Sequence, residues 1–289
     1  MNGIIILDKP AGRTSHDMVY AVRRLVGIKK VGHTGTLDPM ATGVLPICVG
    51  NATKIADMLT LSDKAYTAGL VLGKTTDTLD AEGNVLTECE VNCSEKEIRD
   101  AINSFVGEIE QVPPMYSAIK QNGKKMYELA RQGIEVERKS RRVKINSIDI
   151  LKIDGVRVTI DVSCSKGTYI RTLCDDIGKK LGVGAYMETL RRTKTGCFNI
   201  EESHTIEELE GVKADGQLES IMIPVDRMFA QYPKIVLNPK QIRSVTNGVA
   251  MTYRGEEGQS YRVYDENGSF LCVSEIVGGR LKLKKSFWN

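Results

Sequence analysis

The chain has 289 residues, of which 41% are hydrophobic and 27% charged, and its formal net charge at pH 7 is +3. This composition is typical of a globular protein with one large domain, or with a large and a small one. No apolar run approaches the ~18–20 residues of a membrane span, and the first residues lack the basic leader of a signal peptide. We therefore expect a cytoplasmic protein with no membrane partner.

Possible metal ligands are scattered along the chain. The seven cysteines include no Cys-x-x-Cys pair, and the three histidines are far apart, so the ligand spacing of a zinc site is absent. Cys48, Cys164 and Cys174 lie among apolar residues and are predicted to be buried, reduced thiols. We expect no metal ion.

The first elements have clear boundary signals. Residues 3–9 form an apolar run typical of a buried strand. Thr14 and Asp17 have the spacing of a capping box, which predicts a helix that begins there and ends at Gly27.

The next stretch, from Gly32 to Pro46, follows no helical or strand period. Its glycines permit positive φ angles and the close approach of another molecule, and Pro39 favours an extended Asp38. An Asp-Pro pair often begins a helix, but Gly43 and Pro46 would end that helix after one turn. We expect a stiff loop that presents the Asp38 carboxylate, which is more typical of a site than of a connection.

Alternating and amphipathic patterns predict the elements that follow. The expected strands are 44–50, 65–73, 143–153, 156–164 and 195–200. The first expected helix is 52–59, and a second begins at a capping box at Ser94. A third helix carries Leu173 and Ile177 and ends at Gly182. The Asp154-Gly155 pair is a strong hairpin signal. Tyr169 and Arg171 lie where a strand passes into a helix, a common place for site residues.

Residues 74–83 form a polar loop with three acidic groups, Asp77, Asp80 and Glu82. Such a loop could hold a metal ion, but its spacing does not match that of an EF-hand. We interpret it as a structural loop that is ordered by its own hydrogen bonds.

Positive charge is concentrated in one region. Between Lys120 and Lys144, nine basic residues stand against three acidic ones. Pro113-Pro114 introduces this region, and we interpret residues 112–142 as a basic RNA-binding insertion that contacts phosphates. A solvated helix face followed by a basic loop is the alternative interpretation.

Beyond Tyr232 the sequence consists of short β runs at 261–264, 270–273 and 281–283, separated by turns that contain glycine. This pattern predicts a small β-barrel after a linker that contains proline. The expected domains are residues 1–231 and 232–289.

The residues by themselves indicate one candidate carboxylate, Asp38, with Tyr66 and Tyr169 at strand ends and Arg171 close to the second tyrosine. The patterns of a Ser-His-Asp hydrolase, a P-loop and a Rossmann fingerprint are absent. A lone carboxylate with tyrosines and an arginine suits nucleophilic or acid–base chemistry on a flat polar ring. Tyrosine can stack on a nucleobase with ~1–3 kcal/mol, and arginine can hold a carboxylate ionised.

Residues 32–43 resemble the catalytic motif of the TruB family of tRNA pseudouridine synthases. Further motifs support the resemblance in the family's order: residues 8–15, 62–66, 114–118, 165–171 and 190–193. Met40 takes a position often held by leucine, which is a mild change. The tail beyond Tyr232 resembles the family's small PUA-type RNA-binding domain.

The resemblance implies an α+β pseudouridine-synthase fold, with a mixed and mainly antiparallel sheet flanked by helices and loops, and a PUA-like β-barrel at the C-terminus. It implies a monomeric isomerase that converts uridine to pseudouridine at position 55 in the TΨC loop of tRNA. It implies no cofactor and no metal ion. The target base must be flipped out of the folded arm, which costs free energy of unstacking.

The resemblance also implies roles for individual residues. Asp38 is the nucleophile, Arg171 pairs with it, and Tyr66 stacks on the uracil and is placed for proton abstraction from C5. Other substrate or RNA contacts are implied for His33, Tyr169, Leu190, Lys9 and Pro10, and in the basic insertion for Lys120, Lys124, Lys125, Arg131, Arg141 and Arg142.

Alternatives stay open at this point. Lys9 and Pro10 could shape a turn beneath the site instead. The chain could be a non-catalytic tRNA-binding or tRNA-folding protein of the same fold, or a phosphate-binding small-molecule enzyme that uses residues 32–35 as an anion loop. The sequence does not decide whether Asp38 attacks C6 or C1′, or whether a glycal forms.

Overall fold

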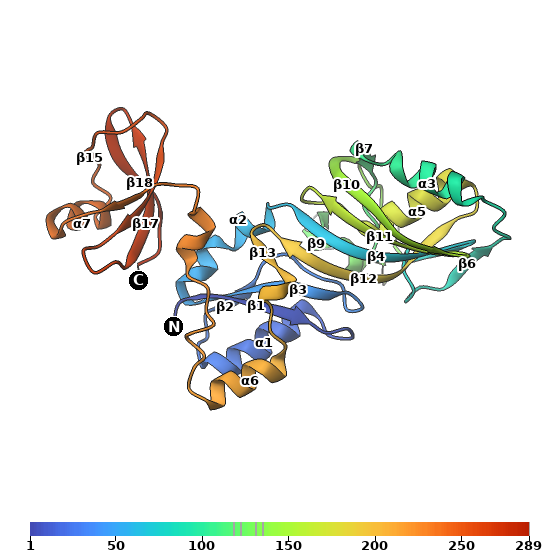
Figure 1. Cartoon of the computed structure of the whole chain (residues 1–289), viewed down its shortest axis with the longest axis horizontal. Coiled ribbons are helices and arrows are strands. Elements are labelled where there is room, and N and C mark those ends of the chain that lie inside the picture. Colours follow the sequence, from blue (N-terminus) through green and yellow to red (C-terminus); the bar gives the residue numbers. More distant parts are fainter. Residues whose placement is uncertain (118, 122, 131, 135, 289) are drawn as a thin grey trace.

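The computed structural model describes residues 1–117, 119–121, 123–130, 132–134 and 136–288. A nine-stranded sheet forms its centre, in the order β1-β3-β12-β4-β11-β10-β7, with β2 paired to β3 and β13 paired to β12 (Figure 1). The strands of this sheet are β1 (Gly3–Lys9), β2 (Val31–His33), β3 (Thr42–Val49), β4 (Lys64–Leu72), β7 (Gly107–Gln111), β10 (Arg141–Asp154), β11 (Arg157–Cys164), β12 (Ala185–Thr195) and β13 (Phe198–Asn199).

The pairing in this sheet is antiparallel except between β12 and β3, which are parallel. The helices of this part of the chain are α1 (Ser15–Val26), α2 (Ala56–Thr60), α3 (Glu95–Asn103), α4 (Met126–Ala130), α5 (Ile170–Leu181) and α6 (Ile206–Ala214), with 3₁₀ turns η1 (Gly50–Ile55), η2 (Ile200–Glu202) and η3 (Val225–Phe229). The expected α+β class with a mixed, mainly antiparallel sheet is confirmed.

Several predicted boundaries are confirmed by the backbone. The Thr14 side chain caps α1 in a capping box with Asp17, and Gly27 ends the helix with φ 68°. Strands β10 and β11 form the expected hairpin, and Gly155 in its turn has φ 59°. Cys48, Cys164 and Cys174 are buried.

The expectation for residues 186–200 is wrong. The structure has one long strand, β12, over 185–195, in place of a segment that leads into a strand at 195–200. Arg191 and Arg192 interrupt the apolar alternation of this strand, so its sequence does not read as a central strand. The structure accommodates them because Arg191 pairs with Asp8 and Arg192 donates to backbone carbonyls. The helix expected at 52–59 is divided into the 3₁₀ turn η1 and the short helix α2.

Two small hairpins leave the main sheet. Strands β5 (Lys74–Thr76) and β6 (Val85–Glu88) enclose the acidic loop, and β8 (Lys120–Gln121) and β9 (Lys124–Lys125) lie in the basic insertion. In the acidic loop, Asp77 accepts hydrogen bonds from Asn84, and Asp80 accepts from Thr78 and the backbone of Glu82. The predicted hydrogen-bonded loop is therefore present, with β5 and β6 at its ends.

The two faces of the large sheet pack against different partners. One core cluster joins the sheet to helices α1, α3, α5 and α6, and includes Leu7, Val22, Ile102, Leu173 and Leu209. In Figure 1, α1 and α6 lie toward one end of this sheet and α3 and α5 toward the other. A second cluster on the opposite face joins β1 and β3 to residues near the C-terminus.

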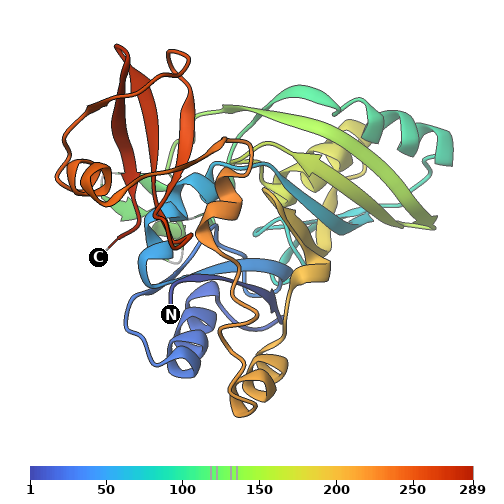
Figure 2. The same ribbon diagram turned by 60° about the vertical axis from the view of Figure 1, so that its left-hand side comes forward.

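The C-terminal part is a separate lobe in Figure 1 and Figure 2. It contains a five-stranded sheet in the order β14-β16-β17-β18-β15 and one helix, and its own core includes Leu237, Val263 and Ile276. Its elements are β14 (Lys234–Val236), α7 (Pro239–Thr246), β15 (Met251–Thr252), β16 (Ser260–Tyr264), β17 (Phe270–Val277) and β18 (Arg280–Ser286). The small C-terminal β-domain expected from the sequence is confirmed, with β14, α7 and β15 as additions.

Aromatic rings join this lobe to the large sheet. The ring centroids of Phe229 and Phe287 are 5.7 Å apart, and those of Phe270 and Phe287 are 5.2 Å apart. Phe229 and Phe287 belong to the same buried cluster as Ile4 and Val44. No helix among the described residues is long and apolar enough to span a membrane.

Candidate active site

The candidate site is built on one row of residues that crosses four strands. Lys9 on β1 pairs in register with Gly43 on β3, Gly43 with Arg192 on β12, and Arg192 with Tyr66 on β4. Residues directly opposite one another in a sheet project to the same face. Lys9, Arg192 and Tyr66 therefore share one face, and the core cluster that contains Tyr66 also contains α1 and α5.

Only glycine fits at position 43 of this row. Its φ is 100°, which side chains rarely adopt, and a Cβ atom at this position would overlap the carbonyl oxygen of Arg192. The parallel contact between β3 and β12 therefore depends on glycine. The close approach at Gly43 is that of a neighbouring strand and not of another molecule.

The loop that carries Asp38 is held from beneath. The Lys9 ammonium is fully buried and donates to the carbonyls of Pro10, Pro39 and Ala41 at 2.9, 3.0 and 2.6 Å. The Ala41 amide donates to the Asp38 carbonyl, so Asp38-Pro39 forms a turn and does not begin a helix. This placement matches the alternative in which Lys9 and Pro10 shape a turn beneath the site.

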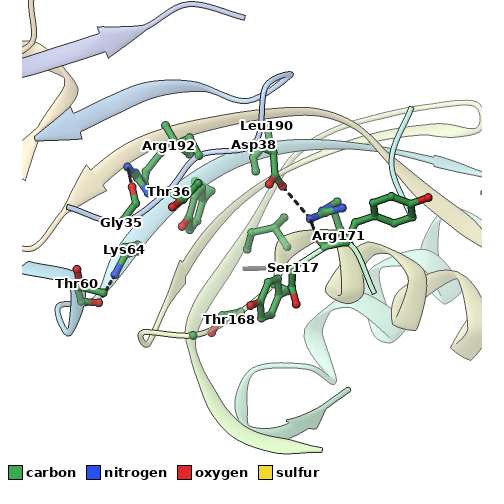
Figure 3. A pocket seen from close by; sticks show the side chains of 16 residues that line it. Gly35, Thr36, Asp38, Thr60, Lys64, Ser117, Thr168, Arg171, Leu190 and Arg192 are labelled. Atoms are coloured by element: carbon green, nitrogen blue, oxygen red, sulfur yellow. Dashed lines mark hydrogen bonds and ion pairs between the residues drawn. The ribbon is translucent and has the colours of Figure 1, made fainter. Parts of the chain in front are cut away.

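Arg171, in the first turn of α5, lies between two carboxylates. Its Nη2 is 3.0 Å from Asp38 Oδ2 (Figure 3). Its Nη1 is 3.2 Å from Asp80 Oδ2. The same guanidinium donates to the carbonyls of Tyr116 and Thr78. These contacts fix the plane of the guanidinium, and so fix the orientation of the Asp38 carboxylate.

Asp38 remains open to its surroundings, since 39% of its side chain is exposed, compared with 6% for Arg171. Burial of the carboxyl in the site raises the pKa of Asp38, and the Asp80 charge acts in the same direction, whereas Arg171 and Lys9 oppose the shift. An accessible carboxylate whose pKa is raised is a better nucleophile or base than an ordinary surface aspartate.

Tyr66 and Arg192 form the other part of the site. The Tyr66 side chain is buried, which raises the pKa of its hydroxyl, while the nearby Arg192 guanidinium lowers it. Arg192 is 1% exposed and is held by hydrogen bonds from Nε to the Val44 carbonyl at 2.8 Å and from Nη2 to the Gly35 carbonyl at 3.1 Å.

These groups surround a pocket of about 280 Å³. Asp38, Tyr66, Tyr169, Arg171 and Leu190 all line it, so the structure brings together the residues singled out in four separate segments of the sequence. A neighbouring cavity of about 690 Å³ is also lined by residues from the Asp38 loop and by Arg171. A flat ring could therefore enter one pocket while an adjacent group occupies the other.

His33 lines the larger cavity together with Asp38. Burial lowers the pKa of His33, and His16 and Arg192 lower it further, so the imidazole is neutral near pH 7. Its Nδ1 is buried without a hydrogen-bond partner among the described residues.

The basic insertion is connected to the pocket. Tyr116 and Ser117 line both cavities, and Arg141 is close enough to Tyr169 to lower its pKa, although burial raises that pKa overall. Lys124, Arg141 and Arg142 are exposed. Arg131 lies outside the described residues, and the side chains of Lys120 and Lys125 are not described.

Sequence reasoning missed three charged residues of the site. The sequence assigns Asp80 only to its own loop, and Lys64 and Arg192 fall within the motifs at 62–66 and 190–193 without an assigned role. A signal for Asp80 was its position in a polar loop soon after the strand of Tyr66. No local pattern indicates its contact with Arg171, because 91 residues separate them.

Known proteins resemble this chain along nearly its whole length. A tRNA pseudouridine synthase B from Clostridium kluyveri is 46% identical over 99% of this chain and 100% of its own length, and one from Clostridium perfringens (strain 13 / Type A) is 48% identical over 99% and 98%. Two solved structures share the fold: a Cbf5-Nop10-Gar1 complex (TM-score 0.74, 28% identity) and an H/ACA RNP bound to a substrate RNA containing 2′-deoxyuridine (TM-score 0.73, 26% identity). Each match covers 99% of this chain and 85% of the other.

The TruB family pseudouridylate synthase N-terminal domain matches residues 23–170, and the tRNA pseudouridylate synthase B C-terminal domain matches residues 171–230. Fold and matches together define an enzyme of the pseudouridine synthase class. The chain belongs to the TruB family.

Proposed function

We propose that this chain acts as a monomer that isomerises uridine to pseudouridine at position 55 in the TΨC loop of tRNA, with Asp38 as the nucleophile. The observation that carries the proposal is the Asp38 carboxylate, open to a pocket and held 3.0 Å from Arg171. The relatives named tRNA pseudouridine synthase B support tRNA as the substrate.

The isomerisation replaces the C1′–N1 bond of the nucleotide with a C1′–C5 bond. The C1′–N1 glycosidic bond breaks, the uracil turns, a C1′–C5 bond forms, and the proton leaves C5 while N1 gains one. Arg171 keeps Asp38 ionised for its attack on the nucleotide. The bond that Asp38 forms with the nucleotide breaks again before the product leaves, which regenerates the carboxylate. Tyr66 lies in the same pocket, which supports Tyr66 as the group that stacks on uracil and takes the C5 proton. Burial raises the pKa of its hydroxyl, and the Arg192 charge opposes that shift.

RNA binding is assigned to two other regions. The exposed residues Lys124, Arg141 and Arg142 would contact phosphates of the stem-loop, and His33, which lines the larger cavity, would contact a displaced nucleotide. We assign catalysis to residues 1–231 and additional RNA contacts, at the acceptor stem, to residues 232–289.

The decisive experiment compares the wild type with Asp38→Asn, using tRNA labelled with tritium at C5 of uridine. We expect the wild type to release tritium, and Asp38→Asn to release none while its Kd for tRNA stays within about twofold. Asp215→Asn, an exposed aspartate at the end of α6, is the matched control. Wild-type turnover by Asp38→Asn would overturn the role of Asp38.

The same experiment separates the other two interpretations. A non-catalytic tRNA-binding protein would bind tRNA without release of tritium by the wild type. A small-molecule enzyme with an anion loop at residues 32–35 would bind free UMP saturably and show no preference for RNA. We expect instead a preference for the tRNA stem-loop over UMP that weakens as the salt concentration rises.

A further inference from the structure

The charges that line the 280 Å³ pocket do not balance. Among its described lining residues the cations are Lys64, Arg171 and Arg192, whereas Asp38 is the one carboxylate. Asp38 is paired with Arg171. Two cations thus face the pocket without an ion pair to a carboxylate in the described part of the chain.

Lys64 and Arg192 are held by backbone atoms that leave their charges uncompensated. Lys64 Nζ donates to the carbonyls of Ser62 at 2.6 Å and Thr60 at 3.2 Å. The hydrogen bonds of Arg192 to Val44 and Gly35 also end on carbonyls. Carbonyl oxygens orient a cation but carry no net charge, so an anion that enters the pocket would find both groups preorganised.

The two side chains both lie next to Gly35, which lines the pocket. A Cβ atom built on Gly35 would lie 3.6 Å from Arg192 Nη1 and 3.7 Å from Lys64 Cε. Figure 3 shows Gly35, Lys64, Thr60 and Arg192 on one side of the pocket, and Asp38 and Arg171 on the other. The pocket therefore has a cationic side away from the proposed nucleophile.

This arrangement is unfavourable in the unliganded protein. Burial, and after it the Arg192 charge, lowers the pKa of Lys64 to about 8. Burial likewise lowers the pKa of Arg192. Uncompensated buried cations are costly, and a bound anion would remove this cost.

We propose that Lys64, supported by Arg192, binds a phosphodiester group next to the flipped uridine. This inference rests on the proposed function, because a nucleotide whose uracil reaches Asp38 carries its nearest negative charges on the adjoining phosphates. The subsite would fix the position of the nucleotide along the pocket, so that its base lies between Asp38 and Tyr66.

The test uses a TΨC stem-loop RNA with one neutral methylphosphonate linkage, placed either 5′ or 3′ of the target uridine. We compare the wild type, Lys64→Gln, Lys64→Arg and the control Lys96→Gln. Lys96 is an exposed lysine on α3, paired with Asp100, and it does not line the pocket, so its variant removes a lysine charge outside the proposed subsite. Both the Kd for the RNA and kcat/KM are measured.

We expect one of the two linkages to weaken wild-type kcat/KM by about 10- to 100-fold, the range of a charge-assisted hydrogen bond. On native RNA, kcat/KM of Lys64→Gln should be lower than that of the wild type by a similar factor. On the RNA with the sensitive methylphosphonate linkage, kcat/KM of Lys64→Gln should fall no further. Lys64→Arg should keep most of the dependence on the phosphate, and Lys96→Gln should behave as the wild type. The lack of additivity identifies a direct contact, since a purely structural effect of Lys64→Gln would multiply with that of the linkage.

Additive losses, or equal activity on native and modified RNA at both linkages, would overturn the inference. The proposed function is judged separately by tritium release from native RNA. If the wild type binds the stem-loop but releases no tritium, the proposed function fails. The contact between Lys64 and the phosphate is then tested by whether the effects of Lys64→Gln and of the linkage on Kd are additive.

Discussion

Arg171 Nη1 lies 3.2 Å from the Asp80 carboxylate, and at most 6% of either side chain is exposed. Asp80 comes from the loop between β5 and β6, whereas Arg171 begins α5. This buried contact positions the guanidinium that in turn holds Asp38. The nucleophile we propose thus depends on a residue that does not line the smaller pocket.

Asp80→Asn should therefore impair turnover more than binding. The variant keeps the shape of the side chain but removes the charge that holds Arg171, and we expect kcat/KM to fall by about 10- to 100-fold with a loss of ~1–3 kcal/mol in the free energy of unfolding. Asp77→Asn, in the same loop but exposed, should cost no more than ~0.5 kcal/mol. Equal losses of kcat/KM and of stability in the two variants would show that turnover depends on the loop as a whole and not on its contact with Arg171.

The pH dependence of catalysis should report the environment of Asp38. Asp38 must be ionised to react, and burial raises its pKa above the ordinary 3.8, so kcat should fall as the pH decreases through that higher value. The Asp80 charge also raises the pKa of Asp38. In Asp80→Asn the acidic limb should therefore move to lower pH, and a pH profile of single-turnover rates measures the shift. A move to higher pH would contradict this account.

Lys9→Met should destabilise the fold strongly. The ammonium group donates to three carbonyls beneath the Asp38 loop, and methionine leaves them without that donor. We expect a loss of ~2–5 kcal/mol in urea denaturation, together with loss of turnover. Lys29→Met, which changes an exposed lysine, is the control. A loss below ~1 kcal/mol would show that the loop holds itself without Lys9.

Stability should depend on pH through Lys9. Its pKa is about 8 in the folded protein and 10.5 unperturbed, so between these values the unfolded chain holds a proton that the folded chain lacks. The wild type should therefore gain stability relative to Lys9→Met as the pH rises from about 8 to 10.5. Buried thiols such as Cys48, whose pKa is raised to about 12, act in the opposite direction in both proteins and cancel in the comparison. A constant difference between the two unfolding curves would contradict the prediction.

Gly43→Ala should disrupt the junction of β3 and β12. The added methyl group would overlap the Arg192 carbonyl and would also require an unfavourable φ of 100°. Gly155→Ala has a positive φ but open space around it, so it measures the backbone cost alone, about 1 kcal/mol. We expect thermal denaturation to show a much larger loss for Gly43→Ala. Equal losses would mean that the strands can separate at little cost.

Elements whose signals are local could be predicted from the amino-acid sequence. The capping box at Thr14, the left-handed Gly27 and the Asp154-Gly155 turn fix where α1 and the β10–β11 hairpin begin and end, since each depends on side chains within a few residues. The loop from Gly32 to Pro46 was identifiable for the same reason, because glycine and proline act on their own backbone.

Only the tertiary structure decided which charges meet. The register of four strands places Lys9, Gly43, Arg192 and Tyr66 in one row, although they are far apart in sequence. The polar pair Arg191-Arg192 concealed the central strand β12, because its compatibility with burial comes from partners on other strands. Asp80 meets Arg171 for the same reason: ion pairs and strand register are set by distances in space, which local patterns of residues do not contain.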